Sequence, residues 1–216
     1  MKYLFLIFCF ISCATTAKIS QTSSAPITPK VADSIKTTTA YEGFFNFEWN
    51  EKTGKILLTV KTLDTEFLYV NSLAAGVGSN DIGLDRGQLG QDRVVKFVKS
   101  GPKILLVQLN TDYRAVSDNM DEITSVEQAF AQSVLGGFKV IKETEKGYQI
   151  DLTPFLLRDA HDVIGRLQRS KQGNYKLDAN RSAIYLPRCK TFPDNAEFEA
   201  TLTFAGTPKG EYIRSV

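Results

Sequence analysis

The chain has 216 residues, which is enough for one sizeable domain with extensions. Hydrophobic residues make up 43% of it, a composition typical of a folded globular protein and not of a disordered one. The formal net charge is +2 and the basic residues are scattered, so the sequence has no electrostatic footprint for nucleic acid and no nucleic-acid partner is expected.

Residues 1–17 have the features of a secretory signal. Met1-Lys2 precede the apolar run Tyr3–Cys13, and small residues follow as far as Ala17. The small residues suit an ordinary signal peptidase. Alternatively, Phe10-Ile11-Ser12-Cys13 resembles a bacterial lipobox, in which Cys13 is lipidated and anchors the mature chain to a membrane.

The lipobox differs from its usual pattern at Phe10, where leucine is common, and a cysteine that merely ends an apolar run remains an alternative. We favour the lipoprotein route because residues 18–40 are rich in Ser, Thr, Ala and Pro, as expected of a flexible linker. Outside the first segment the only cysteine is Cys189, so no internal disulfide is expected in the mature domain.

The folded part is expected to open at Tyr41 with β-strands. Phe45, Phe47 and Trp49 alternate with polar residues, which predicts a half-buried strand, and Gly54 ends the loop after it. Two further strands are predicted at 56–61 and 67–73.

A glycine-rich loop and a hairpin, together residues 75–115, form the stretch around which the rest is organised. The loop is polar and flexible in composition. The apolar runs Arg93–Val98 and Lys103–Leu109 flank Lys99-Ser100-Gly101-Pro102, which predicts a central hairpin. Because function is often placed on loops that a rigid scaffold presents, this loop is a candidate contact region.

The strongest helix signal is a capping box at Ser125-Val126-Glu127-Gln128, preceded by an acidic connector at Asp118–Glu122. The helix is expected to end at Gly136-Gly137. Thr153-Pro154 predicts a short helical turn, and Asp159 is expected to cap another helix.

Further strands are predicted at 138–142, 148–152, 183–186 and 197–204, with a turn at 192–195. Another strand is expected to begin at Glu211, and a chain that stops within an apolar run suggests that more protein followed. The predicted fold class is therefore α+β: a mostly antiparallel β-sheet domain over residues 41–216 with two or three short helices, incomplete at its C-terminus.

Few side chains suited to catalysis are available. His161 is the only histidine, and between Asp159 and Asp162 it is expected to be solvated polar surface. No H-E-x-x-H is present, so no catalytic residue, metal site or cofactor is expected in this chain. Trp49 or Tyr113 could stack on a sugar ring, but their expected strand positions favour core packing.

Cys189 carries one sharper hypothesis. Pro187-Arg188-Cys189 looks like the cysteine-switch motif in the propeptides of matrix metalloproteases, where a thiolate occupies the open zinc position. The residue after the cysteine is Lys190 here, where the motif has glycine. The alternative is a lone structural cysteine that packs as a small buried hydrophobe.

Several stretches together resemble one family, the N-terminal domain of unknown function of large secreted bacterial zinc-dependent metalloproteases. The stretches that carry the resemblance are residues 41–45, 66–70, 83–87, 94–97, 108–115, 130–134, 181–182, 192–197 and 202–204. In that family a catalytic domain with H-E-x-x-H follows further along the chain. The resemblance therefore implies an exported module, in the periplasm, outer membrane or cell surface of a bacterium, with zinc only in the catalytic domain.

On this interpretation the chain is non-catalytic and packs against a metalloprotease domain in the same or a neighbouring chain. The candidate contact residues lie in the glycine-rich loop: Asp81, Asp85, Arg86, Gln88 and Gln91. A rival interpretation is a self-contained envelope lipoprotein that binds a protein or glycan partner. A third, a free-standing hydrolase, predicts turnover by the chain alone, and none is expected.

Overall fold

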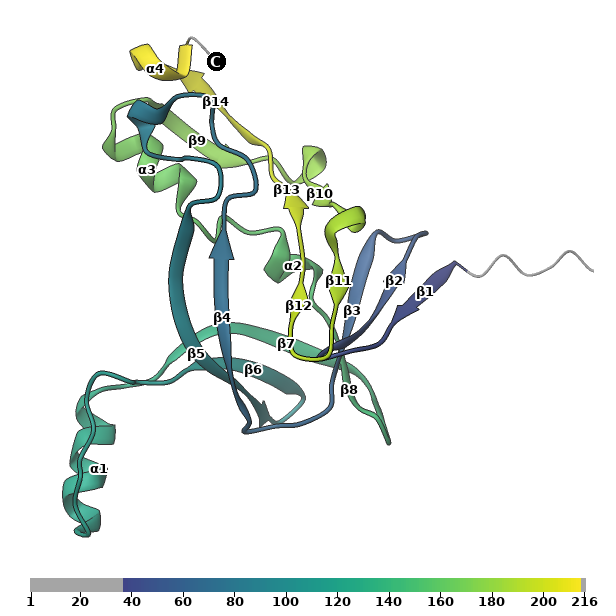
Figure 1. Ribbon diagram of the computed structural model, residues 1–216, viewed down its shortest axis with the longest axis vertical. Helices are drawn as coiled ribbons and strands as arrows, with labels where there is room; N and C mark the ends of the chain where they lie inside the picture. The colour runs from purple at the N-terminus through teal and green to yellow at the C-terminus, as the bar shows by residue number, and fades with distance from the viewer. Residues whose placement is uncertain (1–36, 215–216) are drawn as a thin grey trace, which may run out of the picture. The chain divides into compact units, whose positions relative to one another are not determined.

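The computed structural model describes residues 37–214, in which eight strands form one antiparallel sheet. Their order is β1-β2-β3-β8-β7-β6-β5-β4, and Figure 1 shows the sheet curling on itself. The strands are β1 (Thr38–Tyr41), β2 (Asn46–Asn50), β3 (Lys55–Val60), β4 (Glu66–Ser72), β5 (Leu89–Ser100), β6 (Lys103–Gln108), β7 (Ser133–Thr144) and β8 (Gly147–Asp151). The predicted secretory signal, with the predicted lipidation site Cys13, lies outside the described residues.

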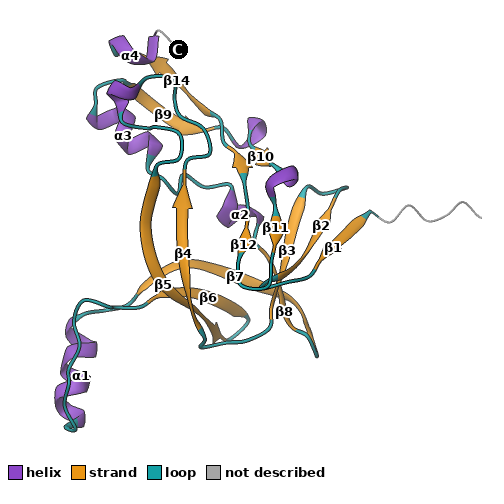
Figure 2. Cartoon of the chain, viewed as in Figure 1, coloured by secondary structure: helices purple, strands orange, loops and turns teal. Residues whose placement is uncertain are grey.

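Short strands and helices make up the rest, as Figure 2 shows. The helices are α1 (Met120–Ala129), α2 (Thr153–Leu156), α3 (Val163–Arg169) and α4 (Glu211–Arg214), with single 3-10 turns η1 (Asn80–Ile82), η2 (Ala179–Arg181) and η3 (Leu186–Arg188). The short strands are β9 (Gly173–Leu177), β10 (Ala183–Ile184), β11 (Lys190–Thr191), β12 (Ala196–Glu197), β13 (Ala200–Thr201) and β14 (Phe204–Pro208). They pair antiparallel as β14 with β9, β10 with β13 and β11 with β12.

The main core is formed by alternate residues of the long strands, because successive side chains of a strand point to opposite faces. Its buried members are Phe47, Ile56, Leu58, Val60, Val95, Phe97, Ile104, Leu106, Phe138, Ile150, Leu152 and Cys189. From the C-terminal segments Ile184, Leu186 and Phe198 pack against this cluster. A mostly antiparallel α+β fold is thus confirmed, with four short helices among residues 37–214 where two or three were expected.

The predicted hairpins are confirmed where the signals are local. β5 and β6 pair in register up to Ser100 and Lys103, so Gly101 and Pro102 form the turn. β2 and β3 pair across a loop that ends at Gly54 as predicted, and Gly54 has a left-handed φ of 64°. The ordered sheet begins at Thr38, so residues 38–40 belong to β1 and not to the linker.

The prediction for helix α1 was wrong at both ends. Asn119 is the N-cap, and its side chain accepts a hydrogen bond from the N–H of Asp121 at 3.0 Å. The acidic residues expected in a connector occupy the first turn, where the helix dipole favours carboxylates. Ser125 lies inside the helix, which ends at Ala129, and Gly136 and Gly137 belong to β7.

The C-terminal predictions also need correction. Residues 197–204 do not form one strand, because β12, β13 and β14 pair with three different partners. Phe198 packs on the main core, whereas Phe204 packs on a second cluster near α3. Glu211 begins the short helix α4 and not a strand. The strand predicted at 183–186 is shorter, since η3 begins at Leu186.

Candidate functional site

The glycine-rich loop between β4 and β5 is docked on helix α3 through two buried side chains. Ile82 is 0% exposed and Leu84 is 3% exposed, and both pack with Val163 and Leu167 of α3. These two apolar residues in a polar loop are the sequence signal by which the docking could have been predicted. The loop is therefore fixed by its own small core, apart from the core of the sheet.

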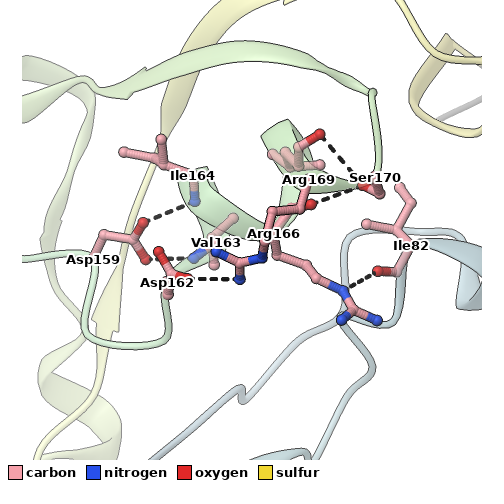
Figure 3. A network of polar contacts seen from close by, with 9 residues as sticks. Ile82, Asp159, Asp162, Val163, Ile164, Arg166, Arg169 and Ser170 are labelled. Atoms are coloured by element: carbon pink, nitrogen blue, oxygen red, sulfur yellow. Dashed lines mark hydrogen bonds and ion pairs between the residues drawn. The ribbon is translucent and has the colours of Figure 1, made fainter.

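Arg166 of α3 binds the glycine-rich loop at Ile82 and lies close to the following residue, Gly83. Its Nε donates a hydrogen bond of 2.8 Å to the carbonyl oxygen of Ile82, as Figure 3 shows. Gly83 has a φ of 71°, and a Cβ at this position would collide with the guanidinium of Arg166. The glycine therefore serves both the left-handed turn and the close approach of the arginine.

The N-cap residue of the helix that carries Arg166 is Asp162, not the predicted Asp159, but the side chain of Asp159 binds the first N–H groups of the helix. The two carboxylate oxygens of Asp159 accept hydrogen bonds from the N–H groups of Val163 and Ile164, both at 2.8 Å (Figure 3). Asp162 forms an ion pair of 2.7 Å with Arg169, about two turns further on. These contacts fix the start of α3, and with it the position of the loop.

The five predicted contact residues of this loop are all exposed. Asp81, Asp85 and Arg86 lie around the buried pair, and Gln88 and Gln91 lie at the start of β5. The side chains that face solvent are thus polar and of both charges, while the backbone beneath them is held in place.

Two of those residues join a hydrogen-bonded network that sequence reasoning did not find. His161 Nδ1 lies 3.1 Å from the amide nitrogen of Asn71, and its Nε2 lies 3.4 Å from the Oε1 of Gln88. In these contacts the amide nitrogen of Asn71 donates to Nδ1, and Nε2 donates to the oxygen of Gln88. Arg93 donates to the Oδ1 of Asn71 at 3.4 Å and to the Oε1 of Gln91 at 3.1 Å.

This network ties the ends of β4 and β5 to the segment before α3. His161 is half-buried and bridges two chain segments, so its setting is more specific than the solvated helix start that was expected. Asn71 and His161 are ninety positions apart in the sequence, and no local pattern signals their contact.

A family model describes part of this chain. The model for a domain of unknown function, DUF5117, matches residues 87–215, which is more than half of the chain. The chain belongs to the DUF5117 family. No curated protein and no solved structure matches it.

The folded unit of this DUF5117 protein is longer than the matched region. The match begins at Gly87, just before β5, and reaches α4. The sheet nevertheless needs β1 to β4, because β3 pairs with β8 and β4 pairs with β5. The family description gives no activity, so the resemblance to metalloprotease N-terminal domains stays a prediction.

Cys189 of the DUF5117 domain is a buried member of the main core, 1% exposed. Its Sγ lies 3.6 Å from the carbonyl oxygen of Tyr185 and 3.7 Å from that of Glu199. Burial raises the pKa of this thiol, which disfavours the thiolate. Zinc binding by Cys189 would require these contacts to open.

Two further features of residues 37–214 concern metal binding and membranes. Among them no three His, Cys, Asp or Glu side chains gather in a way that could hold a metal ion. No helix of this part of the chain is long and apolar enough to cross a membrane.

Proposed function

We propose that this DUF5117 protein is the non-catalytic N-terminal module of an exported bacterial zinc-dependent metallopeptidase. The module packs against a catalytic domain that carries H-E-x-x-H and the zinc, in the same or a neighbouring chain. Export follows from the secretory signal, and lipidation of Cys13 would attach the module to a membrane. The metallopeptidase assignment rests on the family resemblance of the sequence.

The observation that carries a docking role is the construction of the glycine-rich loop. Its backbone is held by Ile82, Leu84 and the hydrogen bond from Arg166, while the predicted contact residues stay exposed. A loop that is fixed before binding loses little conformational entropy when a partner docks. Its polar surface suits contacts between domains, which are more polar than obligate interfaces.

A photo-crosslinking amino acid at Arg86 tests the proposal in the bacterium that makes the protein. The expected product joins Arg86 to a polypeptide that contains H-E-x-x-H, identified by mass spectrometry of the crosslinked peptides. The matched control carries the same amino acid at Lys52, an exposed position in the β2–β3 turn away from the loop. It is expected to give little of this product.

Two results would contradict the proposal. Crosslinking of Arg86 only to other envelope proteins or to glycan would favour the rival interpretation, a self-contained binding lipoprotein. Zinc-dependent cleavage of peptides by the purified chain alone would show that the module is itself catalytic.

A further inference from the structure

Residues 109–132 form an arm that leaves the sheet between two paired strands. Gln108 at the end of β6 lies opposite Ser133 at the start of β7. A two-residue turn is enough to join antiparallel neighbours in such a register. Instead the chain runs outward and returns through α1, which Figure 1 shows projecting beyond the strands. The connection is thus far longer than the pairing of β6 with β7 requires.

No residue of the arm contributes to either core. Every residue from Leu109 to Ala131 is exposed or half-buried, and α1 has no buried residue. Tyr113 was expected to lie on a strand, but it belongs to the arm and is 55% exposed. The arm must therefore have another reason to be ordered.

The arm is held in shape by its own contacts. The rings of Tyr113 and Phe130 stack at 3.9 Å where the outgoing and returning segments meet. Asn110 Oδ1 accepts hydrogen bonds from the N–H groups of Asp112 and Tyr113, and Asn119 caps the helix. A local structure formed in advance, without help from the core, is suited to insertion into a partner.

The apolar side chains of the arm are presented to the outside. Val116 is 99% exposed, Met120 at the start of α1 is 66% exposed, and Phe130 at its end is 38% exposed. Ile123 and Val126 lie between the last two along the helix and are half-buried. Helices that bind in grooves carry their anchors at this spacing, and exposed apolar groups of this kind mark interaction sites.

The charge of the arm specifies the chemistry of its partner. Between Arg114 and Lys139 the chain has no basic residue, although its net charge is +2. The same stretch holds four exposed acidic residues: Asp118, Asp121, Glu122 and Glu127. Arg114, near the base of the arm, is its only basic residue. An apolar stripe with mostly acidic neighbours is complementary to an apolar groove that is bordered by Lys and Arg.

We infer that the arm is a docking helix that inserts into such a basic-rimmed apolar groove on the catalytic domain. The inference rests on the proposed function for the identity of that domain. It adds a second contact element to the glycine-rich loop, which Figure 1 places beside α3 and well away from α1.

The experiment introduces the photo-crosslinking amino acid at Met120 of the full chain in its own bacterium, beside a second strain that carries it at Arg86. Products from both positions on a polypeptide with H-E-x-x-H are expected. A product from Arg86 without one from Met120 would overturn the docking arm and leave the proposed function standing. Met120 joined only to a second copy of this chain, or to an unrelated protein, would also overturn it. Failure at both positions would instead reject the proposed function.

A charge reversal tests the basic rim. Glu127→Lys places a cation in the last turn of α1, where the helix dipole favours it, so the helix itself is not weakened. The yield at Met120 is expected to fall by about two- to fivefold, the size of one exposed charge contact. The control Glu145→Lys makes the same charge change in the β7–β8 turn and should leave the yield unchanged. Equal yields in both variants would exclude a basic rim.

Discussion

At the scale of single residues, the charged side chain of Asp151 connects the end of β8 to β3 and to the start of α2. Its carboxylate forms an ion pair of 2.7 Å with Lys55 of β3 and accepts a hydrogen bond of 3.0 Å from the N–H of Thr153. Partial burial acts to raise the pKa of Asp151, but the hydrogen bonds from Lys55 and Thr153 outweigh it and lower the pKa. The charged form therefore stabilises the folded state.

The sign of the pH dependence follows from that lowered pKa. The stabilisation is complete above the unfolded pKa of about 3.9 and is lost as the pH falls through the lower folded pKa. At neutral pH Asp151→Asn is expected to reduce the free energy of unfolding by about 1 kcal/mol. Urea unfolding of the two proteins at about pH 7 and about pH 3 should show this difference shrinking in acid.

Asp64→Asn is the matched control. Asp64 pairs with Lys96 at 3.3 Å, but its side chain is 64% exposed, and such surface pairs contribute less than about 1 kcal/mol. Its left-handed φ of 55° is one that asparagine tolerates. A difference for Asp151→Asn that stays constant from neutral to acidic pH would contradict the role given to its charge.

At the scale of elements, alanine substitutions at two positions of the glycine-rich loop distinguish the cost of backbone strain from the cost of displacing a neighbouring side chain. Gly83 and Gly87 both have a left-handed φ, of 71° and 80°. A Cβ at Gly87 would meet no atom within 4 Å, whereas one at Gly83 would displace Arg166. Gly87→Ala is expected to cost about 1 kcal/mol, and Gly83→Ala about 1 kcal/mol more because the hydrogen bond to Ile82 is lost. Urea unfolding measures both, and equal costs would show that Arg166 does not hold the loop.

The elements that the sequence predicted well are those whose signals are local. Alternating residues with a turn between them determine β2 with β3 and β5 with β6, and Asp159 lies only four positions before Val163, whose N–H it binds at the start of α3. Helix α1 was misplaced because Asn119 and Ser125 are competing caps only six positions apart, and propensity does not choose between them.

The parts of the site that could not be predicted depend on contacts between distant segments. Arg166 and Ile82 are eighty-four positions apart, and nothing in either stretch identifies the other as its partner. Apolar and polar residues do alternate over 197–204, but the segment is divided among three short strands, each with a different partner strand from elsewhere in the chain. Its apolar side chains pack on two different core clusters. A candidate loop was therefore predictable, but its anchoring was not.

At the scale of the whole molecule, the described fold has a core of strands and an arm that the core does not use. Replacing residues 109–132 by Asn-Gly would close β6 onto β7 through a two-residue turn between Gln108 and Ser133. The shorter connection lowers the entropic cost of closing the loop between β6 and β7 by up to about 2 kcal/mol. The asparagine after Gln108 keeps a backbone N–H, but a turn toward β7 at that position directs it away from β5. The 3.0 Å hydrogen bond that the N–H of Leu109 donates to the carbonyl of Val94 is then lost, at a cost of about 1 kcal/mol.

The net expectation for the closed variant is a free energy of unfolding that is unchanged or raised by about 1 kcal/mol. Urea unfolding followed by circular dichroism measures it against the parent chain. A loss of more than about 2 kcal/mol would mean that the arm supports the core, as only buried residues normally do. If stability is kept while crosslinking from Arg86 to the partner falls, the arm is maintained for binding, because folding does not need it.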